Sequence, residues 1–356
     1  MRAISVLATL LFVAAACGGQ PGASPAATTA PTSDPAAALA SFYSGKTVRL
    51  IVGYTPGGGY DTYARLLAAH IGKYIPGTPT VIVENMDGAG SLKAANHLFT
   101  TAPKDGTVFG TFGRGLPASE LLGDADVSFK STQFNWMGSM NDEVSVCVVR
   151  SDSRTKTLQD ALTNTVRIGA TGPDDDTGFF PRFLNGLIGT KFDLKIGYPG
   201  GNDVNLAIDR GEVEGRCGFS WSSLVSTRQN WLDTKFINIL VQMSLNKHPD
   251  IPSNVPLIMD FITNAEQKQL AEVVFSRQTM GRPYAIPPGV PAERVQALRD
   301  AFDKTMKDSA FLEDAKKAKQ ELNPKSGKEI QAIVEKIFQT PQAQRDKLKQ
   351  ILAGTY

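Results

Sequence analysis

One junction decides the fold: Val48-Arg-Leu-Ile-Val-Gly-Tyr-Thr-Pro-Gly-Gly-Gly-Tyr-Asp61. Its β-branched start predicts a strand at Val48–Val52, and the helical spacing that follows predicts a helix over Asp61–Tyr74. The apolar residues of that helix recur at steps of four and three and form one stripe that faces a sheet: Tyr63, Leu67, Ile71 and Tyr74. The glycines permit positive φ and a close approach of a ligand to backbone N–H groups, and Asp61 lies at the expected N-cap.

The same alternation of β-branched runs and helical segments continues along the chain. After the junction the expected elements are a strand at Thr80–Val83, a helix near Leu92–Thr100 and a strand at Val108–Phe112. A second series contains strands at Val144–Val149, Arg167–Ala170, Lys195–Tyr198 and Gly215–Phe219, and helices near Phe179–Leu187 and Asp203–Asp209. The segment Pro291–Ile351, rich in Lys, Glu and Gln, predicts further helices. Strand-helix-strand order predicts parallel α/β layers.

A second junction, Tyr198-Pro-Gly-Gly-Asn-Asp203, has the same strand-turn-helix character as the first. The unpaired N–H groups and the dipole at such a helix start attract carboxylate or phosphate. A plain turn before a capped helix is the alternative explanation of each junction.

The composition is that of an ordinary globular protein. The chain has 356 residues, of which 42% are hydrophobic and 20% charged, with 37 Lys and Arg against 35 Asp and Glu. These values exclude a disordered, collagenous or coiled-coil chain. With a formal charge of +2 and no basic run, nucleic acid is not an expected partner. The length favours two lobes over one core.

The N-terminus carries targeting information. Arg2 precedes an apolar run, Ala3–Ala16, that is too short to span a bilayer, and the run ends at Cys17. This pattern predicts a lipoprotein signal peptide at residues 1–17 with a lipidated Cys17, and the alternative is a signal without lipid. Residues 18–45 are expected to form a disordered tether rich in Ala, Pro, Ser and Thr. The protein is therefore expected to be exported and to contact the periplasmic or extracellular side of a membrane through the lipid alone.

The two remaining cysteines, Cys147 and Cys217, lie in strand-like runs. In an exported chain they are candidates for a disulfide. Two buried free thiols that pack as small hydrophobic side chains are the alternative.

Catalytic and metal-binding motifs are absent from the sequence. It contains no G-x-S-x-G, Walker A, H-E-x-x-H or C-x-x-C pattern. His70, His97 and His248 lack the spacing of metal ligands. We therefore expect no catalytic residues, no metal and no cofactor.

Six motifs in order resemble the periplasmic solute-binding receptors of tripartite tricarboxylate transporters, called Bug receptors. The resemblance covers Lys46–Ile351. The motifs are Tyr54-Thr-Pro-Gly-Gly-Gly-Tyr-Asp61 with Ala64-Arg65, Val83-Glu-Asn-Met-Asp-Gly-Ala-Gly90, Ala102-Pro-Lys-Asp-Gly106 with Lys104 interposed, Tyr198-Pro-Gly-Gly201, Arg210-Gly-Glu-Val213 and Ile286-Pro-Pro-Gly-Val-Pro291.

The resemblance implies a type II periplasmic-binding fold, in which two α/β lobes joined by hinge strands close over a ligand in the cleft between them. Residues 46–148 with 273–356 would form lobe 1, and residues 149–272 lobe 2. It also implies a monomeric receptor that binds a small organic acid and delivers it to membrane subunits, with no bond made or broken. The alternative is a ligand sensor that feeds a signalling partner. An exported enzyme on this fold would need a nucleophile and a base, which the sequence does not offer.

The resemblance places the ligand between two loops and one strand end. The first loop is Thr55–Asp61, the second is Thr171–Thr177, and the strand end lies at Phe219–Trp221, where ligands of open α/β sheets bind. The expected binding residues are Thr55, Gly57, Gly58, Gly59, Tyr60, Asp61, Arg114, Thr171, Gly172, Asp176, Thr177, Ser220 and Trp221. If the first loop binds the ligand, Gly58→Val should abolish binding.

Three features of this site have two explanations each. Asp174, Asp175 and Asp176 depart from the family's small residues; they either form a solvated loop that caps a helix or contact a ligand hydroxyl, an amine or a metal. Arg114 is either a bidentate carboxylate ligand or a surface residue. The aromatic rings of Tyr60 and Trp221 form either a wall of the site or hinge packing.

Overall fold

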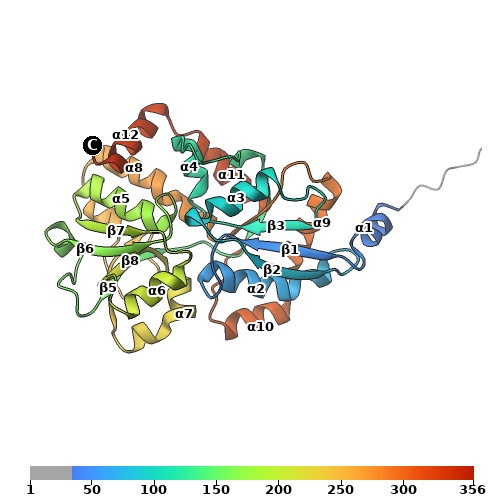
Figure 1. The fold of residues 1–356 in the computed structure, drawn as a ribbon, viewed down its shortest axis with the longest axis horizontal. Helices are drawn as coiled ribbons and strands as arrows, with labels where there is room; N and C mark the ends of the chain where they lie inside the picture. Colours follow the sequence, from blue (N-terminus) through green and yellow to red (C-terminus); the bar gives the residue numbers. More distant parts are fainter. Residues whose placement is uncertain (1–33) are drawn as a thin grey trace, which may run out of the picture. The chain divides into compact units, whose positions relative to one another are not determined.

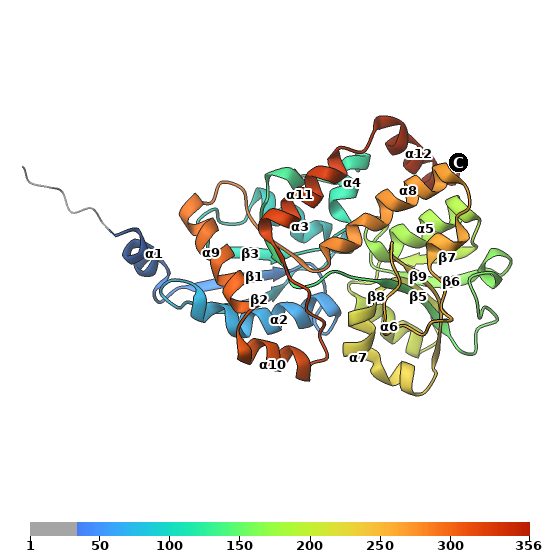
Figure 2. The same ribbon diagram turned by 180° about the vertical axis from the view of Figure 1, so that it is seen from behind.

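The computed structural model describes residues 34–356. The predicted signal peptide, Cys17 and most of the predicted tether lie outside the described residues. The folded unit runs from Pro35 to Tyr356 and contains two mixed sheets, each covered by helices (Figures 1 and 2).

Lobe 1 is built on a six-stranded sheet with the order β11-β4-β10-β3-β1-β2. Its strands are β1 (Thr47–Val52), β2 (Thr80–Asn85), β3 (Val108–Thr111), β4 (Asn135–Ser139), β10 (Pro283–Ile286) and β11 (Lys325–Ser326). Strand β1 pairs parallel with β2 and β3, whereas β10 pairs antiparallel with β3 and β4. The helices of lobe 1 are α1 (Pro35–Tyr43), α2 (Gly59–Ile71), α3 (Leu92–Thr100), α4 (Leu116–Leu122), α9 (Ala292–Thr305), α10 (Ser309–Lys317) and α11 (Gly327–Phe338).

Lobe 2 is built on a five-stranded sheet with the order β7-β6-β8-β5-β9. Its strands are β5 (Ser145–Arg150), β6 (Val166–Ala170), β7 (Phe192–Ile196), β8 (Gly215–Ser220) and β9 (Ile237–Met243). Strand β6 pairs parallel with β7 and β8, and β5 pairs antiparallel with β8 and β9. The helices of lobe 2 are α5 (Asp176–Ile188), α6 (Gly201–Asp209), α7 (Trp221–Asp233), α8 (Ala265–Ser276) and α12 (Gln342–Ala353).

Both faces of each sheet are buried, which explains why the central strands are apolar at successive positions. In β1, Val48, Leu50 and Val52 pack into one core cluster and Ile51 packs into another. Three residues of the predicted stripe are confirmed, since Tyr63, Leu67 and Ile71 of α2 are fully buried. The helix ends at Ile71 rather than at Tyr74, which lies in the following 3-10 turn and is partly buried. The expected parallel βαβαβ order is thus confirmed in lobe 1.

Within residues 34–356 the chain passes between the lobes three times, whereas the predicted boundaries contain two crossings. All of β5 pairs in the sheet of lobe 2, so the first crossing covers residues 140–144 and precedes the predicted boundary at 148. Helix α8 packs into the core of lobe 2 and places the second crossing at residues 277–282. The third crossing lies at 339–341, because Leu348 and Ile351 of α12 are buried in the core of lobe 2.

The start of the folded unit also differs from the prediction. Residues Pro35–Tyr43 form helix α1, so the predicted tether does not extend to residue 45. Tyr43 is fully buried and its hydroxyl donates a hydrogen bond to the Gly106 carbonyl at 3.2 Å. The Arg294 guanidinium lies 3.6 Å from the ring centroid of Phe42. Two aromatic side chains thus attach helix α1 to lobe 1, although the other residues of this segment gave little indication of a helix.

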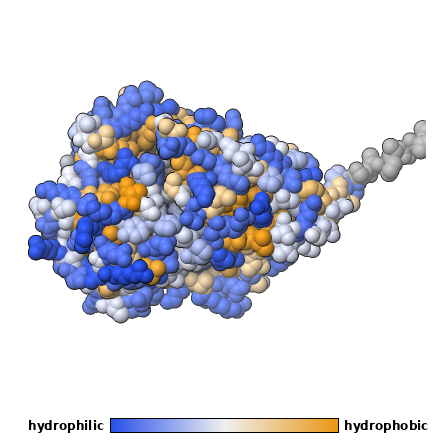
Figure 3. Space-filling model, in the orientation of Figure 1, coloured by the Kyte–Doolittle hydropathy of each residue, from blue (hydrophilic) through white to orange (hydrophobic). Residues whose placement is uncertain are grey.

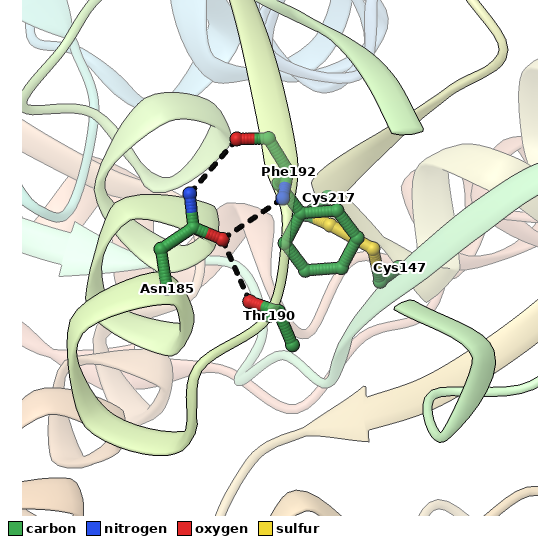
Figure 4. Close-up of a disulfide and its surroundings, with 5 residues drawn as sticks. All are labelled: Cys147, Asn185, Thr190, Phe192 and Cys217. Carbon is green, nitrogen blue, oxygen red and sulfur yellow. Dashed lines mark hydrogen bonds between the residues drawn. A yellow bond between two sulfur atoms is a disulfide. The ribbon is translucent and has the colours of Figure 1, made fainter. Parts of the chain in front are cut away.

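A disulfide joins Cys147 of β5 to Cys217 of the adjacent antiparallel strand β8 (Figure 4). Both half-cystines are fully buried in the core of lobe 2. Phe192 of β7 lies beside the bridge, and its backbone N–H and carbonyl are both hydrogen-bonded to the Asn185 side chain. The bridge therefore fastens two strands of a single lobe.

Replacing both half-cystines by alanine is expected to lower the free energy of unfolding by about 4 kcal/mol, because the bridge spans 70 residues and a loop of that length loses much chain entropy when closed. Urea unfolding of the double variant and of the wild type measures the difference. Intact mass of the unreduced wild type should show two hydrogens fewer than the reduced protein. Labelling of both thiols without reductant would contradict the bridge.

Within residues 34–356, no helix combines the length and apolar character that crossing a membrane requires. On the face drawn in Figure 3, hydrophobic residues form separate patches among hydrophilic ones.

Candidate ligand-binding site

A cavity lies between the lobes, where the first turns of several helices converge. Its volume is about 60 Å³ by the measure used for protein cavities, and about 590 Å³ when all space between the atoms and the open mouth is counted. Its walls include the starts of α2 in lobe 1 and of α5 and α6 in lobe 2, and the strand end before α7. The lining residues are Tyr54, Gly58, Gly59, Tyr60, Gly113, Arg114, Thr171, Asp175, Asp176, Thr177, Gly201, Asn205, Arg216, Gly218, Phe219, Ser220, Ser223, Thr227 and Arg282. Helix starts present N–H groups and positive dipole ends, which favour an anion.

The lobes touch on both sides of this cavity. The Thr55 hydroxyl of lobe 1 donates to the Asp203 carboxylate of lobe 2 at 2.6 Å, so the two glycine-rich junctions meet. At the other side, a Cβ on Gly172 would lie 2.7 Å from the backbone nitrogen of Gly90. The structure is therefore a closed form, with glycines where the lobes meet.

An ion pair crosses the cleft beside the cavity. Arg114 follows β3 in lobe 1, is 2% exposed, and its Nη2 lies 2.7 Å from Asp176 Oδ2 at the start of α5. The same guanidinium donates to the hydroxyls of Ser145 and Ser220 at 2.9 and 3.2 Å. Burial alone would lower the pKa of Arg114. The Asp176 carboxylate acts in the opposite direction, and the pKa is raised above its usual range. Arg114 lines the cavity, where it is paired with Asp176 rather than exposed on the surface.

A second lining arginine, Arg282, also has a carboxylate partner. Its Nη2 lies 3.2 Å from Oε1 of Glu143, whose side chain is fully buried. Nη2 also donates to the hydroxyl of Ser223 at 2.5 Å, and the guanidinium stacks 4.6 Å from the ring centroid of Tyr60. Residues 282 and 143 belong to two crossing segments, so this pair lies at the hinge.

The third lining arginine, Arg216 of β8, differs from the other two. It is 5% exposed, and among the described residues no carboxylate lies within ion-pair distance of it. Its Nη1 donates to the Gly201 carbonyl at 2.8 Å and to Asn205 Oδ1 at 2.9 Å, and its buried Nε, like those of Arg114 and Arg282, has no hydrogen-bond partner. Burial lowers the pKa of Arg216 to about 10, so the side chain is still charged at neutral pH. This guanidinium is the best placed group for a ligand carboxylate.

The three consecutive aspartates each have a partner within the chain. Asp175 is the N-cap of α5 and accepts hydrogen bonds from the N–H groups of Thr177 and Gly178; Asp174 pairs with Arg182 at 3.4 Å. Burial raises the pKa of Asp175 to about 6, against the lowering effect of the Thr171 and Thr177 hydroxyls. The prediction that one aspartate caps the helix is confirmed, but the expected solvated loop is wrong for Asp175 and Asp176, which are buried and line the cavity.

Five of the predicted site residues do not line the cavity: Thr55, Gly57, Asp61, Gly172 and Trp221. Thr55 and Gly172 instead lie where the lobes touch. Helix α2 begins at Gly59, with Gly58 as N-cap in place of Asp61. Asp61 accepts from the Gly57 N–H at 2.9 Å and pairs with Arg65 at 2.8 Å, which shapes the loop. Trp221 packs in the core of lobe 2, whereas Tyr60 lines the cavity.

The most informative residues that the sequence did not single out are Arg216 and Arg282. Arg216 lies within the predicted strand Gly215–Phe219, and an isolated arginine in a strand gives no indication of whether it faces a ligand. Arg282 belongs to the second crossing, for which the sequence predicted no element. Phe219, which follows Arg216 in the same strand, was named only as part of a strand end.

His248 lies near two carboxylates, although the sequence predicted no metal ligand there. Ligand atoms of His248, Asp250 and Glu321 lie within 4.8 Å of one another. The Nδ1 of His248 accepts the Asp250 N–H at 3.2 Å, which leaves the proton of the neutral ring on Nε2, 2.8 Å from Glu321 Oε1. The arrangement is a hydrogen bond between the lobes, and its geometry opposes metal binding through Nε2.

Sequence comparisons identify two curated relatives. A UPF0065 protein of Cupriavidus necator is 33% identical over 129 residues, which cover 36% of this chain and 38% of the relative. A UPF0065 protein of Agrobacterium vitis is 26% identical over 219 residues, which cover 59% and 61%. The chain thus spans less than two thirds of the length of either relative. No protein-family model matches it.

Solved structures share the fold over most of the chain. The periplasmic binding protein BugD has a TM-score of 0.70 at 18% identity, covering 87% of this chain and 98% of its own. Rpa4515 of R. palustris, solved with adipate, has a TM-score of 0.67 at 17% identity, covering 86% and 97%. MatC of Rhodopseudomonas palustris, solved with bound malate, has a TM-score of 0.66 at 18% identity, covering 86% and 98%.

These structural neighbours, among them a periplasmic binding protein, confirm the predicted fold class. The chain has the type II periplasmic-binding fold of the Bug and tricarboxylate-type binding proteins and is similar in sequence to UPF0065 proteins.

Proposed function

We propose that this chain is an extracytoplasmic solute-binding receptor of a tripartite tricarboxylate-type transporter. It captures a small organic acid by closure of its two lobes and delivers the acid to membrane subunits. The single observation that carries the proposal is a buried arginine without a carboxylate partner, Arg216, in a cavity formed by helix starts from both lobes. Two related structures, solved with adipate and with bound malate, support an organic acid as the ligand class.

The rest of the proposal follows from the role of such a receptor. Export with a lipid at Cys17 would hold the protein at the membrane surface, and a monomer would present one closed cleft to the membrane subunits. The ligand stabilises the closed state, because only that state brings groups from both lobes into contact with the ligand.

A thermal-shift screen of the purified protein tests the receptor function. The panel contains mono-, di- and tricarboxylates, amino acids and sugars. A ligand present at about 100 times its dissociation constant should stabilise the protein by roughly 2.7 kcal/mol, which raises the melting temperature by several degrees. Stabilisation by sugars alone would contradict the proposal.

Anion binding is expected to strengthen as the pH falls from 7.5 to 5.5. The pKa of Asp175 is raised to about 6, so this lining carboxylate loses its charge across that interval and stops repelling the ligand. The charged groups that act on it are Asp176 of α5, Arg216 of β8 and Arg277 at the end of α8. We expect roughly a tenfold gain, since unit charges a few ångströms apart interact by about 1–4 kcal/mol.

Calorimetric titrations at both pH values measure this change. Asp175→Asn provides the control, because asparagine keeps the N-cap but does not titrate. The variant should bind with the same affinity at pH 7.5 and 5.5. An equal gain in the variant and the wild type would show that another group is responsible.

A further inference from the structure

The cavity contains one positive charge in excess of its negative charges. Three arginines and two aspartates line it: Arg114, Arg216, Arg282, Asp175 and Asp176. Behind this wall, Glu143 pairs with Arg282 and Arg277 lies 3.4 Å from Asp176, so these two outer charges cancel each other. Both are buried, as are all five lining residues. With Glu143 and Arg277 included, the buried cluster of charged side chains still has one positive charge more than negative charges.

Arg216 is the arginine of this cluster with no carboxylate at ion-pair distance among the described residues, although the Asp175 carboxylate acts on it from farther away, whereas Arg114 and Arg277 share Asp176. Arg114 and Arg282 each have a carboxylate partner, at 2.7 and 3.2 Å. The Nη1 of Arg216 is used by two neutral oxygens, of Gly201 and Asn205, which leaves the edge formed by Nε and Nη2 without a partner among the described residues. That edge matches the two oxygens of one carboxylate.

Among the described residues, the cavity has no second cationic side chain that lacks a carboxylate partner. The remaining lining side chains are neutral, and several hydroxyls already accept from arginines: Ser220 from Arg114 and Ser223 from Arg282. Asp175 and Asp176 add two negative charges to the wall. A second carboxylate on the ligand would therefore be buried without a cation of its own, which costs several kcal/mol in a water-excluded space.

We infer that the receptor selects ligands with a single negative charge, small monocarboxylates with a neutral body, and rejects dicarboxylates. This inference rests on the proposed function and narrows its ligand class. It separates the chain from the structural neighbours solved with adipate or malate, ligands that carry two carboxyl groups. Arg216 sets the preference for an anion, and Asp175 sets the limit of one charge.

Calorimetric titration at pH 7.5 tests the inference with three ligand skeletons: succinate, glutarate and adipate. Each is used as the dianion, as the monomethyl ester with one charge, and as the neutral dimethyl ester. We expect a monomethyl ester to bind at least tenfold more tightly than its dianion, and the dimethyl esters not to bind. Tighter binding of the dianions would overturn the inference and leave the receptor function intact. If none of the nine compounds binds, the proposed function itself fails for small organic acids.

The substitution Asp175→Asn then tests the cause of the selectivity. It keeps the helix cap and gives the cluster a second excess positive charge. The dianions should gain at least tenfold relative to the monomethyl esters. Asp174→Asn is the matched control, because Asp174 pairs with Arg182 and does not line the cavity. Equal selectivity of the wild type and Asp175→Asn, with unchanged melting temperatures, would contradict the role of Asp175.

Discussion

Gly59→Ala should weaken ligand binding at least tenfold, whereas Gly58→Ala should change it less than twofold. A Cβ on Gly59 in lobe 1 would lie 1.8 Å from Oγ and 2.8 Å from Cβ of Ser223 in lobe 2. The Oγ can rotate away but the Cβ cannot, so the lobes must separate. A Cβ on Gly58 meets no atom within 3.8 Å. The residue whose size limits closure is thus the neighbour of the glycine that the sequence suggested.

Calorimetric titration with the best acid from the screen measures both variants. Their unfolding free energies should stay close to that of the wild type, because the clash exists only when the lobes are closed. Ser223→Gly in the Gly59→Ala background removes both clashing atoms and should restore part of the affinity. Full affinity in Gly59→Ala alone would show that binding does not require this closed form.

Arg216→Met has the largest expected effect on affinity, a loss of roughly 100-fold or more. The substitution removes the one lining arginine that, among the described residues, has no carboxylate partner, and truncating one member of a buried charge pair costs about 2–5 kcal/mol. Without ligand, the melting temperature should be unchanged or higher. Burial lowers the pKa of Arg216 from 12.5 to about 10, which means that the folded state disfavours its charged form.

Two further variants test whether the loss of affinity comes from the Arg216 side chain itself. Arg210→Met removes a charge from an exposed side chain just after α6 in the same lobe and should leave affinity unchanged. Arg216→Lys keeps the charge but loses the paired donors, so it should retain only part of the binding. A loss of the same size in Arg210→Met would attribute the effect to net charge rather than to the site.

Local sequence patterns predicted the strands and helices whose buried residues recur at regular spacing along the chain. The β-branched runs and helical stripes identified the central strands and α2. A strand buried on both sheet faces is a short apolar run, and a helix buried on one face repeats its apolar residues at helical spacing. The two glycine junctions predicted two of the helix starts at the site. The expected strand at Lys195–Tyr198 lies at Phe192–Ile196, since the exposed end of an edge strand has little hydrophobic pattern.

The charge pattern of the site could not be predicted in the same way. The partners of Asp176 are Arg114 and Arg277, which lie about 60 residues before it and 100 after it, and no local spacing connects them. The third crossing was missed for a similar reason. An amphipathic helix such as α12 shows that one face is buried but not which lobe buries it.

The central claim is that an organic acid binds in the closed cavity through Arg216. Parallel calorimetric titrations of the wild type, Gly58→Ala, Gly59→Ala and Arg216→Met with one monocarboxylate test it most directly. The structure predicts that the first two bind with similar affinity, that Gly59→Ala is weakened at least tenfold, and that Arg216→Met is weakened most. Equal binding by all four proteins would place the ligand elsewhere and contradict the claim.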